Sequence, residues 1–477
     1  MLFNSLKFLL IFPLIFAIHW AIPAKYNQWR KLFLILVSYA LYMNFKPAFA
    51  LVLLGVALIT YWGGYLLDKQ AVNSEELKDK SSRRKRLAWC FALLALLPLL
   101  VFKYYNFINN SLTDGLAAIG LKFSMPGLNW AVPVGISFFT FQAVGYMLDV
   151  YHERIKVEKN FIDYLLFVSF FPQIASGPIS KADELLPQIK KERTFNYNQA
   201  VSGLKYLLWG MFLKVVLADR VGIYVDTVFG AYEKFSGVGC AIASVFYSIQ
   251  IYADFAGYSL MAVGVGKVLG FDLINNFRRP YFAASVTEFW KRWHISLTRW
   301  LTQQVYIPLG GSRCSKARNY WNIFVTFMVS GIWHGANWTF IVWGCMHGVF
   351  QIVEKAFGWN KKESKGVVKA LRVLVTFIVV TLAWVVFRSP SIGDAFGLLG
   401  RYFISAGKGI ADIQTLAYIA VAIIPLLLLE FGKEVFPKVY DKISGVRVIR
   451  WAAYFAVFAM IVLLGVHDGS SFIYVSF

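Results

Sequence analysis

The chain has 477 residues, of which 58% are hydrophobic and 18% aromatic, whereas charged residues make up only 16%. Soluble domains carry about a quarter charged residues, so this composition excludes an ordinary soluble protein. Lys and Arg number 48 against 26 Asp and Glu, a formal net charge of +22. Either a nucleic-acid surface or the basic cytoplasmic loops of a membrane protein explains such an excess.

The apolar residues form blocks that approach the roughly 20 residues with which a helix crosses about 30 Å of hydrocarbon. Backbone amides in lipid need internal hydrogen bonds, and no block alternates as a barrel strand would, so the spans should be helices. We predict an all-α integral membrane protein, one domain over residues 1–477, with 11 or 12 spans plus re-entrant helices. The predicted spans are Leu6–Pro23, Lys31–Asn44, Ala48–Leu67, Leu87–Phe102, Ala131–Val150, Ala200–Leu217, Val238–Leu260, Trp321–Gly335, Trp338–Val353, Ala370–Arg388, Thr415–Leu429 and Val448–Val466.

The positive charge is concentrated in alternate loops, which are Lys69–Arg86, Lys267–Arg318, Lys355–Arg372 and Lys433–Arg450. The loops between them carry few positive residues. Because basic loops stay in the cytoplasm, this alternation predicts both termini outside. It favours a lipid bilayer as the partner of the basic surface and argues against nucleic acid.

The apolar segment Phe161–Ser176 has basic residues on both sides. A full crossing would place Lys190 and Lys191 outside, against the charge bias. We therefore predict a re-entrant segment that ends at Gly177-Pro178. Broken backbone at membrane depth is tolerated only beside protein or a water-filled cavity, so the segment indicates a chamber inside the protein.

The sequence changes character at Ser285–Gln304, which is too polar for lipid and too aromatic for a solvated loop. Trp290, Trp293, Leu297 and Trp300 follow helical spacing, so we predict a helix with one apolar face. Such a helix suits the membrane interface or the entrance of a polar cavity. The segment lies within residues 250–350, where we expect the chemistry.

His334 follows an uncharged apolar run and is expected well inside the bilayer. An ionisable group at that depth indicates function, and a neutral imidazole can accept a proton as a general base. A structural hydrogen-bonding role explains a lone histidine equally well. Gly335 should let another backbone or a substrate approach closely. His347 in the next predicted span is more typical of a structural residue.

Several stretches, in this order and over nearly the whole chain, are similar to the membrane-bound O-acyltransferase family. The likeness is to its bacterial branch, which includes the membrane subunit of alginate O-acetylation and the D-alanyl transfer protein of teichoic acids. The stretches are Met1–Leu10, Val134–Gln142 with Asp149–Tyr151, Phe170–Gln173 with Gly177-Pro178, Tyr252–Ser259, Phe277–Gly311, Trp333-His334-Gly335 and Phe472–Tyr474. Leu260 departs from the pattern, because many relatives carry Asp after the serine.

The resemblance implies a ring of helices around a central funnel or tunnel, and it assigns His334 as the essential histidine and His294 as the second candidate. It implies transfer of an activated acyl group from the cytoplasm to a hydroxyl at or beyond the membrane. The expected donor is acetyl-CoA or another acyl thioester, delivered by coenzyme A or a carrier protein, with no bound cofactor and no metal. The expected partner is an extracytoplasmic SGNH-hydrolase-like acetyltransferase, and the expected location is the bacterial cytoplasmic (inner) membrane.

Under this hypothesis His334 is the general base, and His294 orients the donor, hydrogen-bonds the oxyanion or holds His334. The candidate substrate or tunnel residues are Trp290, Trp293, Trp333, Asn337, Tyr252 and Asp254. Tryptophan is equally common at membrane interfaces. Arg278, Arg279 and Arg292 suit donor phosphates, although cytoplasmic charge bias explains them more simply.

Three other functions stay open. A proton-coupled transporter would suit many spans with intramembrane histidines, but carriers usually show two related halves, and here the polar segments lie together within residues 252–347. A non-catalytic scaffold would not need His334. Within acyl transfer, D-alanyl transfer from a carrier protein is the alternative to acetyl transfer.

Overall fold

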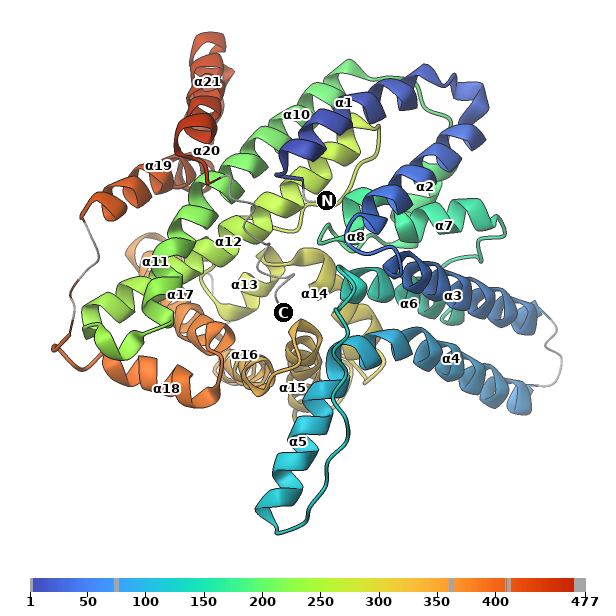
Figure 1. Cartoon of the computed structure of the whole chain (residues 1–477), viewed down its shortest axis with the longest axis horizontal. Helices are drawn as coiled ribbons and strands as arrows, with labels where there is room; N and C mark the ends of the chain where they lie inside the picture. The colour runs from blue at the N-terminus through green and yellow to red at the C-terminus, as the bar shows by residue number, and fades with distance from the viewer. Residues whose placement is uncertain (1–2, 73–76, 360–363, 408, 410–412, 467–477) are drawn as a thin grey trace. The chain divides into compact units, whose positions relative to one another are not determined.

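The computed structural model describes residues 3–72, 77–359, 364–407, 409 and 413–466. None of these residues lies in a β-strand, so the all-α prediction is confirmed for the part that is described (Figure 1). Three helical stretches are wound as π-helices, η2 (Leu100–Tyr104), η3 (Phe212–Ala218) and η6 (Thr302–Tyr306). A π-turn inside an α-helix often marks a functional position.

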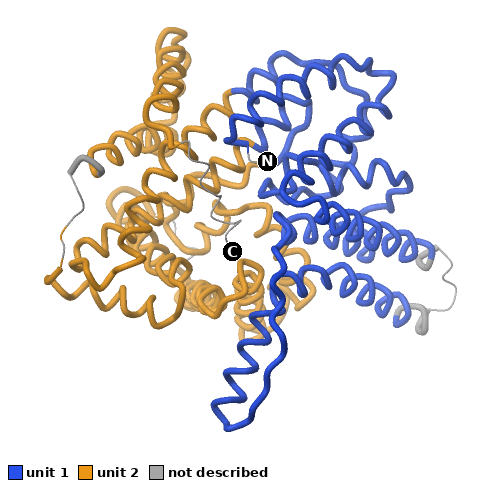
Figure 2. The backbone as a smooth tube through the Cα atoms, in the orientation of Figure 1, with its two compact units in different colours: residues 1–204, 262–274 blue, residues 205–261, 275–477 orange. Residues whose placement is uncertain are grey.

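The chain divides into two compact units, residues 1–204 with 262–274, and residues 205–261 with 275–477 (Figure 2). Two long helices, α10 (Tyr197–Met211) and α12 (Gly237–Val268), contribute to both units. The first unit also contains α1 (Leu6–Ala21), η1 (Ala24–Tyr26), α2 (Asn27–Met43), α3 (Phe49–Val72), α4 (Leu77–Leu99), η2, α5 (Tyr105–Ala118), α6 (Ile136–Tyr151), α7 (Phe161–Ser169), α8 (Phe171–Ile174) and α9 (Ala182–Lys190).

The second unit holds the segment in which we expect the chemistry. Its further helices are η3, α11 (Asp219–Phe229), η4 (Tyr232–Lys234), η5 (Pro280–Phe282), α13 (Val286–Arg292), α14 (Ile295–Leu301), η6, α15 (Lys316–His334), α16 (Trp338–Ala356), α17 (Gly366–Arg388), α18 (Ile392–Arg401), α19 (Ile413–Val435), α20 (Pro437–Gly445) and α21 (Arg447–Leu464). The prediction of a single domain over the whole chain stays a prediction.

Seven helical segments among the described residues are long and apolar enough to cross a membrane, or eight if the bent pair α1–α2 counts as one span. They match seven of the twelve predicted spans. The other five predicted spans are the helices α1, α2, α6, α15 and α16. Helices α1 and α2 meet at 105°, α6 has only 16 residues, and the first turns of α15 contain Lys316, Arg318 and two asparagines. Shortness, bending and polarity explain why fewer simple spans exist than we predicted.

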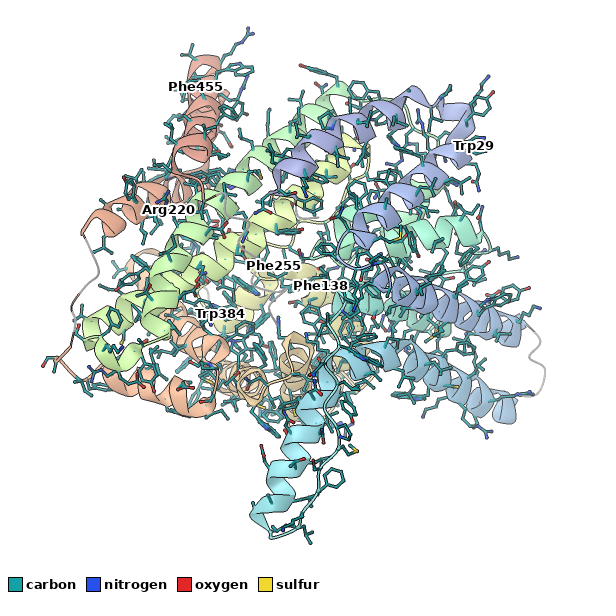
Figure 3. All side chains as sticks on the ribbon, viewed as in Figure 1. Trp29, Phe138, Arg220, Phe255, Trp384 and Phe455 are labelled. Carbon is teal, nitrogen blue, oxygen red and sulfur yellow. The ribbon has the colours of Figure 1, made fainter. Side chains whose placement is uncertain are left out.

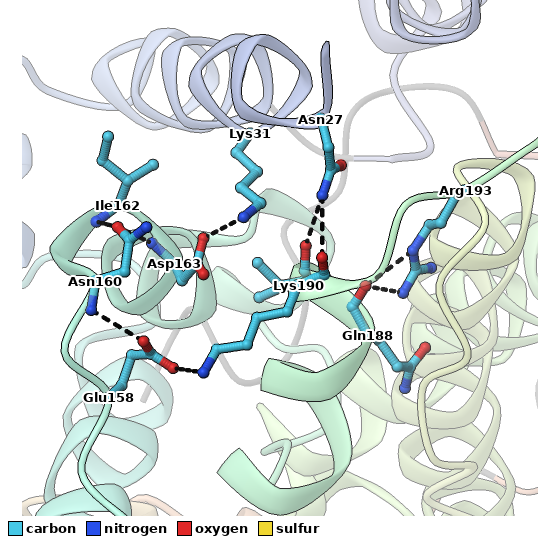
Figure 4. A network of polar contacts seen from close by, with 10 residues as sticks. Asn27, Lys31, Glu158, Asn160, Ile162, Asp163, Gln188, Lys190 and Arg193 are labelled. Carbon is cyan, nitrogen blue, oxygen red and sulfur yellow. Dashed lines mark hydrogen bonds and ion pairs between the residues drawn. The ribbon is translucent and has the colours of Figure 1, made fainter. Parts of the chain in front are cut away.

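The segment predicted to be re-entrant is broken in the structure. Helix α7 has nine residues, about 14 Å at 1.5 Å per residue, which is too short to cross a membrane. Lys31 of α2 forms an ion pair with Asp163 of α7 at 2.6 Å, and both side chains are buried (Figure 4). Asn160 caps α7 by accepting from the Ile162 N–H at 2.9 Å. Polar contacts therefore hold the start of this short helix within the first unit.

Helices α15 and α16 form a tight hairpin in the second unit (Figure 1). Gly331 of α15 and Gly344 of α16 face each other, and a methyl group on Gly344 would lie 2.4 Å from the Phe327 carbonyl oxygen. Glycine lets two helix backbones approach this closely. Because α15 ends at His334, the hairpin fixes the position of that histidine relative to α16.

Candidate functional site

His334 is the last residue of α15, and only 2% of its surface is exposed. Its ring lies 5.0 Å from that of Trp333, 5.0 Å from Trp343 on α16 and 5.3 Å from Phe387 on α17, measured between ring centroids. Three elements of the second unit therefore surround the imidazole with aromatic rings. His334 is thus buried in the protein, and its depth in the bilayer stays a prediction.

Gly335 makes room for a side chain of the same hairpin. A Cβ atom there would lie 2.1 Å from the ring of Phe340, so only glycine lets this ring pack against the chain after His334. The space that we expected to admit a backbone or a substrate is therefore filled by Phe340. The glycine still matters, because a larger residue would push the ring and the end of α15 apart.

The helix predicted over Ser285–Gln304 is interrupted at the second candidate histidine. Helix α13 ends at Arg292 and α14 begins at Ile295, because His294 has φ 41° and ψ 54°, a left-handed conformation that ends a right-handed helix. Helical spacing in the sequence predicted one continuous apolar face, and that part of the prediction is wrong. The break turns the His294 side chain away from the direction that a continuous helix would give it.

His294 is completely buried in the second unit. Its ring lies 4.6 Å from Phe255 of α12 and 5.7 Å from Trp333 of α15 (Figure 3 labels Phe255). Burial lowers the pKa of His294 to about 3, so its imidazole is neutral at pH 7 and keeps one nitrogen as a hydrogen-bond acceptor.

Both candidate histidines contact the same tryptophan, Trp333. Trp333 contacts His294 at 5.7 Å and His334 at 5.0 Å between ring centroids. The two histidines are far apart in the sequence, yet a single aromatic ring touches both. The structure therefore brings the two candidate imidazoles to the same indole ring.

Local sequence signals account for the start of α13. Ser285 accepts a hydrogen bond from the Glu288 N–H at 3.0 Å, and Glu288 accepts one from the Ala284 N–H at 2.9 Å. This is a variant of the capping box formed by serine and glutamate three residues apart. Glu354 of α16 accepts from the Thr287 N–H at 2.9 Å, which joins α13 to the hairpin.

Trp290 in α13 and Trp293 at the C-terminal end of that helix pack in the protein interior. Trp290 donates its indole N–H to Nδ1 of His347 at 3.2 Å, and Trp293 lies 5.0 Å from both Phe277 and Trp384 (Figure 3 labels Trp384 on α17). Both tryptophans are at most 4% exposed. Their burial disfavours the alternative of tryptophans at a membrane interface.

Asn337 and Tyr252, two of the candidate substrate residues, form hydrogen bonds within the protein. Asn337 caps α16 by accepting from the Thr339 N–H at 3.0 Å, and it donates to the Pro390 carbonyl oxygen at 2.8 Å. Tyr252 donates its hydroxyl hydrogen to the buried carboxyl group of Glu430. These contacts hold the side chains in place, and a role in substrate binding stays a prediction for both.

Asp254 belongs to a buried ionic triad of the second unit. Lys214, in the π-helix η3, lies 2.7 Å from one carboxylate oxygen of Asp254 and 2.7 Å from one of Asp219. The lysine and Asp254 side chains are each 1% exposed. A buried charge needs such partners, and nothing in the sequence spacing pointed to Lys214.

Of the three arginines that could bind the phosphates of the donor, two form ion pairs with glutamates and one is exposed. Arg279 lies 2.7 Å and Arg292 3.1 Å from the two carboxylate oxygens of Glu434, and Arg292 also pairs with Glu288. Arg278 is exposed. Among the residues that the structure describes, no group of three or more His, Cys, Asp or Glu side chains is placed to hold a metal ion.

The profile of the membrane-bound O-acyltransferase family (MBOAT) matches residues 150–388, half of the chain, and this range includes His294, Trp333 and His334. The chain belongs to this family. It is 33% identical to the Pseudomonas syringae protein named "Probable alginate O-acetylase AlgI", over 93% of this chain and 84% of that protein.

Two further relatives extend the comparison. The peptidoglycan O-acetyltransferase of Helicobacter pylori is 34% identical, over 84% of this chain and 79% of the relative. The teichoic acid D-alanyltransferase of Bacillus subtilis is 26% identical, over 70% of this chain and 84% of the relative. The predicted family is therefore confirmed, and this MBOAT protein is a multi-pass membrane acyltransferase. The terminal motif at 472–474 and the first two residues of the N-terminal motif lie outside the described residues.

Proposed function

We propose that this MBOAT protein takes an acetyl group from an acyl thioester on the cytoplasmic side and passes it to a hydroxyl group of an exported polysaccharide. The observation that carries the proposal is the meeting of His294 and His334 on Trp333, in a chain whose relatives include named O-acetyl transferases. Acyl transfer to a hydroxyl needs a base and a group that stabilises the oxyanion, and two imidazoles can supply both.

In the proposed reaction His334 accepts the proton of the acceptor hydroxyl while that oxygen attacks the thioester carbonyl carbon. A carbon–oxygen bond forms, and the carbonyl electrons move to its oxygen to make a tetrahedral oxyanion. Collapse of the oxyanion breaks the carbon–sulfur bond. The thiolate leaves and takes the proton back from His334, so atoms and charge balance without a redox step or a metal.

His294 would stabilise the oxyanion or hold the acyl group against Trp333. A hydrogen bond to the developing charge is worth more in a buried, water-poor site than in solution. His294 is fully buried, and its neutral ring donates from one nitrogen. Trp290, Trp293 and Trp333 would exclude water from the reacting atoms, which protects the thioester from hydrolysis.

The donor, partner and location are further parts of the proposal. We propose acetyl-CoA or another acyl thioester as donor, an extracytoplasmic SGNH-hydrolase-like partner that completes transfer to the polymer, and the bacterial cytoplasmic (inner) membrane as the location. The alternative of D-alanyl transfer is supported by a relative of lower identity, 26% against 33–34% for the O-acetyl relatives. That difference makes acetyl the preferred group.

The test uses purified wild-type protein, His334→Ala and the matched control His152→Ala in nanodiscs with radiolabelled acetyl-CoA. His152 is exposed at the C-terminal end of α6. Alginate oligosaccharides and peptidoglycan fragments serve as acceptors. We expect wild type and His152→Ala to release free thiol, and to label the acceptor once the extracytoplasmic partner is added, whereas His334→Ala should do neither at equal protein level. Thiol release by His334→Ala would overturn the assignment of the base.

A further inference from the structure

The backbone of His294 adopts a conformation that its own residue type does not favour. Its φ of 41° lies in the left-handed region, which non-glycine residues rarely occupy. A strained residue of this kind costs about 1–3 kcal/mol and persists only where its surroundings hold it. The imidazole does not cap α14, so the support has to come from another segment of the chain.

The support comes from Asn276, which lies before α13 in the sequence. Its backbone carbonyl oxygen accepts from the Ile295 N–H at 3.0 Å, and its side-chain amide oxygen accepts from the Ser296 N–H at 3.0 Å. These two N–H groups open α14, where helical N–H groups lack partners within the helix. One buried asparagine, 1% exposed, thus binds both residues that follow His294.

The residues before His294 are held by the same segment. The Arg278 N–H donates to the Arg292 carbonyl oxygen at 2.9 Å, and the Arg292 guanidinium donates to the Arg279 carbonyl oxygen at 3.3 Å. Residues 276–279 therefore bind the chain on both sides of His294. The histidine sits between these attachment points, so its backbone has little freedom to relax.

We propose that Asn276 is a positioning residue for His294, and this rests on the proposed function of His294 in acyl transfer. By accepting from the Ile295 and Ser296 N–H groups, Asn276 keeps His294 left-handed and directs its ring toward Phe255 and Trp333. The same two hydrogen bonds occupy the N-terminus of α14. That terminus does not serve as an anion site for a donor phosphate, although helix N-termini often do so.

The neighbouring asparagine provides a matched control. Asn275 is exposed, and its side chain donates to the Tyr206 hydroxyl at 3.4 Å. Asn275→Ala removes the same number of atoms one residue away without touching α14. Asn276→Asp keeps an oxygen that can accept from the Ser296 N–H, whereas Asn276→Ala removes it.

The experiment measures kcat and KM for thiol release in nanodiscs, together with the unfolding temperature. We expect Asn276→Ala to lower kcat about 10- to 100-fold with little change in KM, the loss expected when a reacting group moves by about 1 Å. Asn276→Asp and Asn275→Ala should stay within a few-fold of wild type. If Asn276→Ala does not fold, Asn276→Asp carries the test, and a large loss of kcat in its folded form overturns the proposal.

A double-mutant cycle separates positioning of His294 from general support of the fold. The His294→Gln variant replaces the imidazole with an amide and so removes the group that Asn276 is proposed to position. In this variant, adding Asn276→Ala should cause no further loss of kcat. A full additional loss would overturn the proposal. If the wild type releases no thiol, the proposed function fails; if the wild type is active and Asn276→Ala behaves like it, only the role of Asn276 fails.

Discussion

His347 lies in the same aromatic interior as the two candidate histidines, yet its contacts set it apart from them. Trp290 donates to its Nδ1 atom, so the proton of the neutral ring is on Nε2. Its ring centroid is 4.9 Å from Trp343, which in turn contacts His334. The Nδ1 nitrogen, which would have to accept a proton in catalysis, already accepts the hydrogen bond from Trp290. This hydrogen bond indicates a structural role for His347.

Two substitutions of His347 test this role. His347→Asn retains an oxygen near the position of Nδ1, so Trp290 keeps an acceptor and acyl transfer should persist. His347→Leu leaves the buried indole N–H without that acceptor, which costs about 1–3 kcal/mol and should lower the unfolding temperature measured in nanodiscs. Loss of acyl transfer in His347→Asn at an unchanged unfolding temperature would place His347 in the chemistry instead.

At the scale of elements, the α15–α16 hairpin determines where His334 lies. The two helices contact through glycine, and a Cβ atom on Gly344 would lie 2.4 Å from the Phe327 carbonyl oxygen and 3.0 Å from the Cα atom of Gly331. Real Cβ atoms do not come this close to a backbone, so any larger residue must separate the helices. Separation would move His334 relative to Trp343.

A pair of glycine substitutions measures this packing. Gly344→Ala should lower both the unfolding temperature and acyl transfer, because the helices have to move apart. Gly400→Ala is the control, since Gly400 is exposed in α18 and a Cβ atom there would meet no described neighbour within 4 Å. Alanine there should leave activity unchanged and favour the helix by about 1 kcal/mol. Equal unfolding temperatures for the two variants would contradict the packing argument.

At the scale of the whole molecule, charge determines the expected orientation in the membrane. The helical run Ser82–Ala118 has 37 residues, about 55 Å at 1.5 Å per residue, and so exceeds the roughly 30 Å of hydrocarbon. Its start carries the basic group Arg83–Arg86, and its far end carries Asp114. The basic end should be cytoplasmic and the other end should project on the opposite side.

Cysteine labelling in intact cells tests this orientation. In a chain whose exposed Cys90 and Cys314 are replaced by serine, Asp114→Cys should react with a membrane-impermeant maleimide. Lys85→Cys should react only after the cells are permeabilised, because the basic loop faces the cytoplasm. Both positions are exposed in the structure, so a difference in labelling reports the side of the membrane. The reverse pattern would invert the predicted topology.

Much of the fold could be predicted from local patterns in the sequence. Apolar blocks predicted the helices, the Ser285–Glu288 spacing is that of the cap of α13, and charge bias with Gly177-Pro178 predicted the broken segment around Phe161–Ser176. Such features depend on residues within one or two turns of each other. The count of simple spans could not be predicted as well, because α1 and α2 are bent, α6 is short and α15 begins with polar residues.

The sequence by itself determined that this is an all-α membrane protein of the MBOAT family with His294 and His334 as candidate catalytic residues, because composition and short motifs carry that information. Only the tertiary structure decided that both histidines meet on Trp333, that His294 breaks a predicted helix, and that Asn276 holds it there. The contacts of His294 with Trp333 and of Asn276 with α14 join separate segments of the chain. Helical spacing reports which residues share a face, but it does not report what packs against that face.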